Sequence, residues 1–191
     1  MDSFDYLQIA KIIGVTGAAW LSVMLLKTLE EADTARIEGN ITALSLMATP
    51  ALGQSKTDDN TPSTTLAKQW SYIYNRGKVQ NPPVAAITAG SFFYLAWSTR
   101  TTTPQSQLPL LYGSAAAATL GIVPFTLLLM ASTNSKLIRH TAASSKELNP
   151  GAQQSKDEEI LRLLGTWTTL NAVRGLFPLV GAVIGLVAIL G

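Results

Sequence analysis

The sequence predicts an all-α membrane protein, a bundle of four transmembrane helices with helical extensions and an amphipathic interfacial helix. Charged residues make up only 14% of the 191 residues and hydrophobic residues 47%, whereas ordinary soluble domains carry roughly 25% charge. The few charges leave long uncharged runs between them, and a membrane-spanning helix needs about 20 mostly apolar residues. The length suits one integral-membrane domain over residues 1–191.

The first span is interrupted by charge. Residues 8–27 and 39–53 are both apolar, but each uncharged stretch is short for a span, and a strongly charged segment separates them. Removing residues 23–38 joins the flanks into one uncharged run that is long enough to cross a membrane. Valine codons begin with GT and one glutamate codon ends with AG, the boundaries of a short intron. We therefore interpret 23–38 as an insertion or an in-frame retained intron, and span one as residues 8–27 continuing at 39–53.

Three further uncharged runs predict spans at about residues 83–99, 108–132 and 167–190. Most of the 14 Lys and Arg residues fall in the two long loops between spans one and two and between spans three and four. This bias places both loops in the cytosol and both termini in the lumen, so we expect a multi-pass protein of the endoplasmic reticulum. Asn40 begins a glycosylation sequon, which we expect to stay unused because it falls near the cytosolic end of span one.

The segment before span two, TTLAKQWSYIYNRGK, predicts a separate helix. Trp70, Ile73, Tyr74 and Gly77 share one helical face, and Gly77 is a residue type that often ends a helix. Two interpretations stay open for this face. It is either an aromatic lid over a substrate pocket or an interfacial helix that its aromatic side chains anchor at the membrane surface.

The last span carries a continuous polar and small-residue face. Its members are spaced 4, 3, 4, 3 and 4 residues apart, which is one side of a helix: Trp167, Asn171, Arg174, Pro178, Gly181 and Gly185. Arg174 lies about two turns inside the span, where an ionisable residue marks a functional site by default. Its guanidinium can bind a phenolate or an enolate. The alternative is that it caps backbone carbonyls or extends to the lipid headgroups.

Composition excludes several kinds of chemistry. The chain has no Cys and a single His, so it offers no thiolate nucleophile and no multi-histidine or cysteine metal site. A net charge of +2 without a basic patch argues against nucleic-acid binding. The predicted spans lack the Asp or Glu that a proton-coupled transporter uses, and no nucleotide motif occurs. Any enzyme activity is therefore expected to need no metal and no recognisable nucleotide site.

Several stretches together resemble the fungal anthrone oxygenase family, from about residue 12 to the C-terminus. They include GVTGAAWLS, GNITALSLMATPAL, LAKQWSYIYNRGKVQNPP, LGIVPFTLLLMASTNSKL and, as the most specific, WTTLNAVRGLFPLVGAVIGL. In that family the WLS and GN pieces run together, so this chain departs from it by residues 23–38. The resemblance implies a small membrane enzyme of aromatic polyketide biosynthesis that oxidises an anthrone to an anthraquinone with molecular oxygen and without a cofactor.

Residue type and position assign candidate roles within this resemblance. The catalytic candidates are Arg174, Asn171, His140 and Tyr74, and the substrate-binding candidates are Trp167, Trp70, Asn134 and Asn40. Arg174 is expected to stabilise the anthrolate oxygen, with a second hydrogen bond from Asn171. His140 or Tyr74 is the expected base, the aromatic side chains stack on the rings, and the remaining amides orient oxygen or a phenol.

The expected partners are the anthrone, molecular oxygen, the lipid bilayer and other enzymes of the same pathway. The competing interpretation is a non-catalytic four-helix membrane scaffold that holds such enzymes at the membrane. A scaffold predicts that helix–helix hydrogen bonds fill the polar face of the last span and leave no cavity. An enzyme predicts an aromatic-lined cavity near Arg174 that opens to the cytosolic side.

Overall fold

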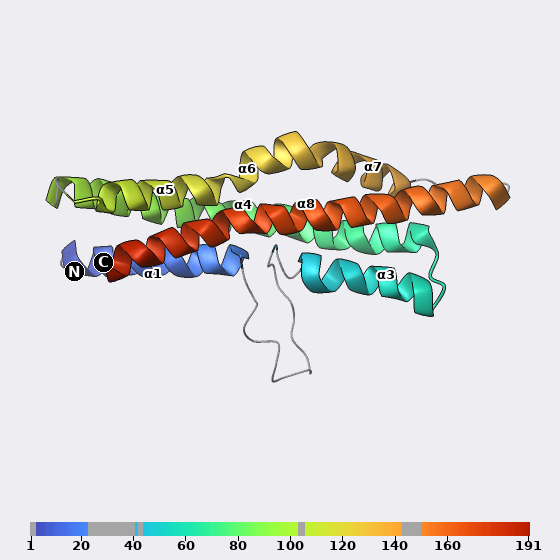
Figure 1. The fold of residues 1–191 in the computed structure, drawn as a ribbon, viewed down its shortest axis with the longest axis horizontal. Helices are drawn as coiled ribbons and strands as arrows, with labels where there is room; N and C mark the ends of the chain where they lie inside the picture. Colours follow the sequence, from blue (N-terminus) through green and yellow to red (C-terminus); the bar gives the residue numbers. More distant parts are fainter. Residues whose placement is uncertain (1–2, 23–40, 42–43, 103–105, 143–149) are drawn as a thin grey trace.

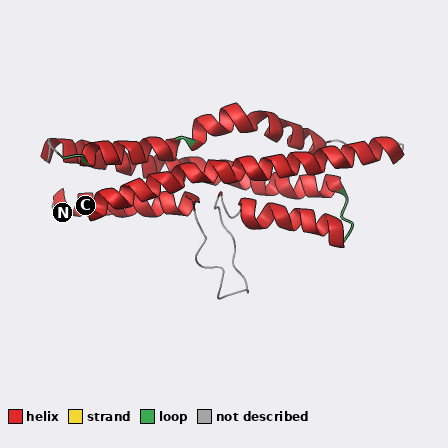
Figure 2. Cartoon of the chain, viewed as in Figure 1, coloured by secondary structure: helices red, strands yellow, loops and turns green. Residues whose placement is uncertain are grey.

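The computed structural model describes residues 3–22, 41, 44–102, 106–142 and 150–191, and the regular elements in these ranges are all helical (Figure 2). The predicted all-α class is therefore confirmed. The interpreted insertion at 23–38 and the candidate Asn40 both lie outside the described residues.

The helices form four parallel or antiparallel rows (Figure 1). Two rows are single long helices, α4 (Ser63–Thr102) and α8 (Pro150–Leu190), with 40 and 41 residues, which corresponds to roughly 60 Å each. A third row contains α1 (Ser3–Ser22), then the short π-helical turn η1 (Leu44–Ala48) and α3 (Thr49–Asp58). The fourth contains α5 (Leu108–Leu120), α6 (Ile122–Phe125), the π-helical turn η2 (Thr126–Met130) and α7 (Ala131–Ala142).

The two ends of the bundle have separate cores. At the end that carries both termini, α1, α4, α5 and α8 pack side by side around small residues such as Ala89, Ala115 and Ala182. Tyr112 closes this core by donating a hydrogen bond to the carbonyl of Ala188 at 3.2 Å. Small side chains let the helix axes approach closely, so this end is tightly packed.

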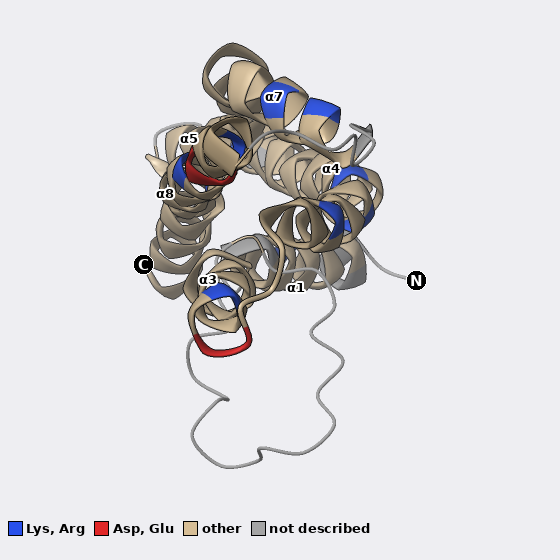
Figure 3. Cartoon of the chain, turned by 90° about the vertical axis from the view of Figure 1, so that its right-hand side faces the viewer, with Lys and Arg blue, Asp and Glu red and all other residues tan. Residues whose placement is uncertain are grey.

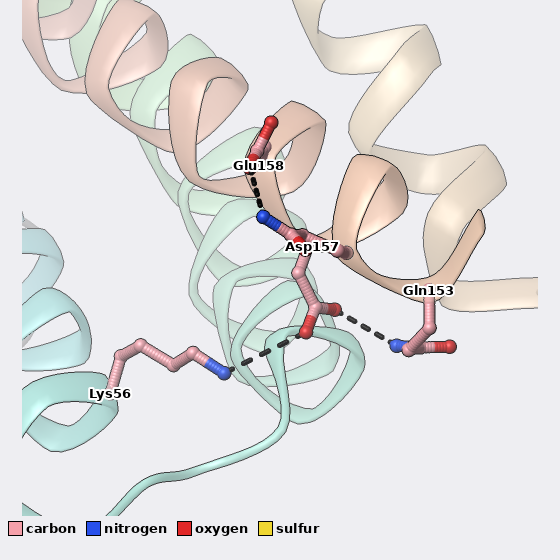
Figure 4. A network of polar contacts seen from close by, with 5 residues as sticks. Lys56, Gln153, Asp157 and Glu158 are labelled. Atoms are coloured by element: carbon pink, nitrogen blue, oxygen red, sulfur yellow. Dashed lines mark hydrogen bonds and ion pairs between the residues drawn. The ribbon is translucent and has the colours of Figure 1, made fainter. Parts of the chain in front are cut away.

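The opposite end is built on large side chains and closed by polar contacts. Its core joins α4, η2, α7 and α8 through Trp70, Met130, Leu137, Ile160 and Trp167, among others, and α3 packs against this core through Leu52. At its outer edge Lys56 of α3 lies 3.8 Å from Asp157 of α8, and Gln153 donates to the same carboxylate (Figure 4). Lys and Arg positions on α3, α4, α7 and α8 are coloured blue at this end, which faces the viewer in Figure 3.

Two helical stretches are long and apolar enough to cross a membrane, Leu108–Thr141 and Pro150–Leu190. They contain the predicted spans at 108–132 and 167–190, and most of their apolar windows face outward, with 28% and 33% of the residues buried. Among the described residues, neither the predicted span at 83–99 nor the predicted first span meets the same test. The coarser description that holds is an all-α bundle with two candidate membrane spans.

The segment before residue 83 is not a separate interfacial helix. α4 continues without a break through Gly77, Pro82 and Pro83, so the prediction that Gly77 ends a helix is wrong. The reason is tertiary packing: Trp70 is fully buried, and the aromatic face packs against α8 in the core. A long helix held by neighbours on this face tolerates residues that break an isolated one.

Candidate active site

A cavity opens near mid-length of the bundle, where the α5–α7 row bends. Gly121 separates α5 from α6, and Pro124 removes a backbone donor from the next turn. From there α6 and η2 bow away from α8 (Figure 1). π-helical turns are rare and often lie at functional sites, and here both of them, η1 and η2, contribute residues to the wall of this cavity.

The cavity has a volume of about 240 Å³ and a mainly apolar wall. This is slightly below the roughly 300–1,000 Å³ of most ligand pockets, so it suits a compact, flat ligand. Its polar or aromatic lining residues come from α4, η2 and α8: Tyr74, Lys78, Asn81, Thr126, Trp167 and Arg174. Among the described lining residues there is no Asp, Glu or His.

Arg174 is held in the cavity wall by two neighbouring side chains. Its Nη1 donates to Thr126 Oγ1 at 3.3 Å, and its Nη2 donates to Asn171 Oδ1 at 2.5 Å. The Nε–H is buried without a partner. Within the described part of the chain no carboxylate pairs with this guanidinium. The site therefore presents an oriented, uncompensated positive charge to whatever occupies the cavity.

Asn171 is fully used in holding this arrangement. It is completely buried, and its Nδ2 donates both to the carbonyl of Ile41 at 2.5 Å and to Ser45 Oγ at 2.8 Å. An amide nitrogen has two hydrogens, so no donor remains for the second substrate hydrogen bond expected from the sequence. The structure thus gives Asn171 contacts that position Arg174 and join α8 to η1.

The aromatic candidates form one cluster beside the cavity. Trp70 and Tyr74 stack at 5.0 Å between ring centroids, and Trp70 meets Trp167 edge-on at 5.7 Å. Tyr74 and Trp167 line the cavity, whereas Trp70 lies behind them and does not. Trp70 therefore supports the two lining rings instead of contacting the contents of the cavity.

Two other candidates lie away from the cavity wall. His140 is in α7, with Nε2 3.4 Å from a carboxylate oxygen of Glu159; Glu159 and Arg174 are 15 residues apart on α8, about 22 Å along the helix. Asn134 is buried in the same helix with an unpartnered Oδ1, but it does not line the cavity. The structure brings Arg174, Tyr74 and Trp167 together and leaves these two apart.

Sequence reasoning missed three polar lining residues: Lys78, Asn81 and Thr126. From the sequence, Lys78 is one of the Lys and Arg residues that precede span two. Its spacing from Tyr74, one helical turn, was the signal that could have placed it beside the site. Thr126 lacked any such signal, because its contact with Arg174 joins residues 48 positions apart in the chain.

The polar face of the last span has one feature that the scaffold interpretation predicts and one that the enzyme interpretation predicts. Asn171 makes the helix–helix hydrogen bonds that a scaffold predicts. An aromatic-lined cavity nevertheless lies beside Arg174, which is what the enzyme interpretation predicts and the scaffold interpretation excludes.

Comparison with known proteins points in the same direction. The family model described as anthrone oxygenase matches residues 70–184, which include α4 from Trp70 onward and most of α8. The chain is 39% identical to the anthrone oxygenase encC of Aspergillus fumigatus, over 94% of this chain and 92% of that protein. It is 41% identical to the anthrone oxygenase tpcL of the same species, over 70% and 76%. No solved structure matches it.

Proposed function

Because this chain belongs to the anthrone oxygenase family, we propose that the cavity beside Arg174 is where it oxidises its substrate. The chain is an enzyme of fungal aromatic polyketide biosynthesis that converts an anthrone to an anthraquinone. The observation that supports this location is the uncompensated guanidinium in an apolar, aromatic-lined cavity. An anionic, flat, tricyclic ligand complements that combination of charge and shape.

The chemistry requires little beyond binding, proton removal and charge stabilisation. Loss of a proton from C10 of the anthrone gives an anthrolate whose negative charge is shared with the oxygen at C9. This electron-rich anion passes an electron to molecular oxygen, and the two radicals combine as a C10 peroxide. Protonation and loss of water then leave a carbonyl at C10. One oxygen atom enters the product and the other leaves as water, so the substrate supplies the electrons and the proposed reaction needs no cofactor.

Arg174 is the group proposed to stabilise the anthrolate oxygen. Its free Nε–H and its fixed charge lie in a wall of low polarity, where electrostatic stabilisation is stronger than in water. The side chain is already oriented by Asn171 and Thr126, so little reorganisation accompanies the reaction.

We propose that Tyr74 takes the C10 proton in its phenolate form and becomes the neutral phenol in that step. The titratable side chains that line the described cavity are Tyr74, Lys78 and Arg174. An arginine stays protonated, so Arg174 cannot be the base. Tyr74 also stacks on Trp70, which keeps its ring in a defined orientation. Trp167 forms the neighbouring wall on which the rings of the substrate stack.

The decisive test replaces Arg174 with Met and measures oxidation of emodin anthrone by purified protein. We expect kcat to fall about 100-fold to 1,000-fold, as for loss of one oxyanion donor. The matched control is Thr126→Val, which removes one holding contact and keeps the charge, and should cost less than tenfold. Wild-type turnover by Arg174→Met would overturn the assignment. Turnover that survives a chelator supports the proposed cofactor independence, and turnover abolished by it contradicts that proposal.

The membrane placement is part of the proposal. Two helical stretches are long and apolar enough to cross a bilayer, and Lys and Arg positions on α3, α4, α7 and α8 lie at the end of the bundle that faces the viewer in Figure 3. We infer an integral protein of the endoplasmic reticulum with its long loops cytosolic, as the positive-inside rule indicates. Anthrone would then enter from the cytosolic side, where other enzymes of the pathway supply it.

A further inference from the structure

Asn81 is a buried polar residue that the reaction proposed above does not use. It lies on α4, only 5% exposed, and it lines the same cavity as Arg174. Its Oδ1 is buried and has no hydrogen-bond partner in the structure. Leaving a buried acceptor unpaired costs about 1–3 kcal/mol, and native proteins leave few of them. An acceptor in a cavity wall indicates a donor on the ligand.

Lys78 completes a second polar position on the same helix. It precedes Asn81 by three residues, which puts the two on one face of α4, and both line the cavity. The ammonium can only donate, whereas Asn81 Oδ1 can only accept. A hydroxyl group is both donor and acceptor, so it can satisfy the two at once. A methyl group or a ring hydrogen can satisfy neither.

We propose that Asn81 and Lys78 form a subsite for a phenolic hydroxyl on an outer ring of the substrate, at a position remote from the reacting carbon and not adjacent to the C9 carbonyl. This inference rests on the proposed function and narrows the substrate class to anthrones that carry such a hydroxyl. The subsite comes from α4, whereas the anthrolate oxygen is assigned to Arg174 of α8. The two helices together then determine which way round the tricycle binds.

A matched pair of substrates tests the subsite. Emodin anthrone and chrysophanol anthrone differ by one outer-ring hydroxyl, which only the first carries. We expect the wild-type protein to prefer emodin anthrone by at least tenfold in kcat/KM, because the hydroxyl pairs a buried acceptor that the other compound leaves unpaired. Equal kcat/KM values would overturn the proposal. Oxidation of neither compound would instead contradict the proposed function.

A substitution then assigns the preference to Asn81. Asn81→Leu removes the acceptor and should therefore abolish the preference, so that the ratio of the kcat/KM values for the two anthrones falls to about one. Asn81→Asp keeps an acceptor and should keep the preference. If Asn81→Leu fails to fold, as judged by its thermal unfolding, binding of emodin and chrysophanol to Asn81→Ala, which also lacks an acceptor, provides the same comparison. A preference that persists in the folded Leu or Ala variant would overturn the role of Asn81.

Discussion

The guanidinium of Arg174 lies in an apolar helix and is oriented by hydrogen bonds to neighbouring side chains. Thr126 of η2 and Asn171 of α8 each accept one of its hydrogen bonds. Asn171 is in turn held by Ile41 and Ser45. Positive charge is therefore kept at the cavity by neutral groups, which orient it without neutralising it.

Replacing Asn171 with Asp tests whether that neutrality matters. The carboxylate keeps an acceptor for Arg174 but pairs its charge, so we expect kcat to fall about 100-fold or more with a smaller change in KM. Steady-state kinetics with emodin anthrone measure the changes in kcat and KM separately. Ser45→Ala is the control, since it removes one of two acceptors for the same amide and should lower stability by about 1 kcal/mol with near-normal kcat. Full activity in Asn171→Asp would show that the net charge is not used.

Substitutions of the two candidate bases, Tyr74 and His140, are expected to have opposite effects on kcat. Tyr74→Phe keeps the ring stacked on Trp70 and removes only the hydroxyl, so we expect kcat to fall about 100-fold to 10,000-fold without loss of thermal stability. His140→Asn should keep kcat within about twofold, because His140 is paired with Glu159 and does not line the cavity. The reverse pattern would return the role of base to His140.

At the scale of the element, the glycines of α8 decide how closely its neighbours approach. A Cβ added at Gly181 would lie 2.9 Å from the carbonyl oxygen of Ala115 and 2.5 Å from Thr119 Oγ1. At Gly185 it would lie 2.5 Å from the ring of Phe92. α5 and α4 therefore occupy the space that any side chain at these two glycines would need.

Gly181→Ala should therefore destabilise the bundle by about 1–3 kcal/mol, the usual cost of overpacking. Gly165 provides a control on the same helix, since a Cβ there meets nothing within 4 Å. Gly165→Ala should be neutral or stabilise by up to about 1 kcal/mol through helix propensity. Thermal unfolding of both variants in one detergent makes the comparison. Equal stabilities would mean that the α5–α8 contact relaxes without cost.

The row that contains α1, η1 and α3 leads to a prediction about residues 23–38. The chain directly after residues 23–38 reaches the site, because Ile41 and Leu44 line the cavity and Ile41 and Ser45 hold Asn171. If 23–38 is an insertion, a variant lacking it should fold at least as stably and oxidise emodin anthrone at least as fast. Sequencing the spliced transcript tests the intron version. Loss of activity in the shortened protein would show that these residues belong to the working enzyme.

At the scale of the whole molecule, the bundle is longer than a membrane is thick. α8 extends roughly 60 Å, about twice the hydrocarbon thickness. If α8 spans a membrane as proposed, about half of it lies outside the apolar layer. The charged half, at the end with the Lys56–Asp157 contact (Figure 4), is the part expected in water. The cavity lies near the middle of the bundle, where an apolar substrate can arrive from either environment.

The proposed orientation of the protein in the membrane can be tested with glycosylation tags. Glycosylation tags placed at either terminus should be modified in microsomes, and a tag placed within the loop around residue 146 should not, because positively charged loops stay cytosolic. Modification of the loop tag alone would reverse the orientation and place the charged end in the lumen.

The inward face of α8 was predictable from the sequence alone. The members of the face are buried or half-buried as their spacing predicts, because a helix has a fixed period. The end of a helix was not predictable in the same way. Gly77 indicated a helix end within α4, but the helix continues because its aromatic face packs against α8. The site was predictable in part. Arg174, Tyr74 and Trp167 line one cavity, but Thr126 lies on η2, which no local pattern connects to these three residues.

The sequence by itself determined the all-α class, the family and the inward face of α8, since composition, motif and helical period are properties of nearby residues. Only the tertiary structure decided that Asn171 holds Arg174 instead of donating to a ligand, that Trp70 supports the cavity wall from behind, and that Asn81 keeps an unpaired acceptor there. The physical reason is that hydrogen-bond capacity is used up by contacts between residues as far apart as 41 and 171. What a side chain has left for a ligand is known only when all of its partners are in place.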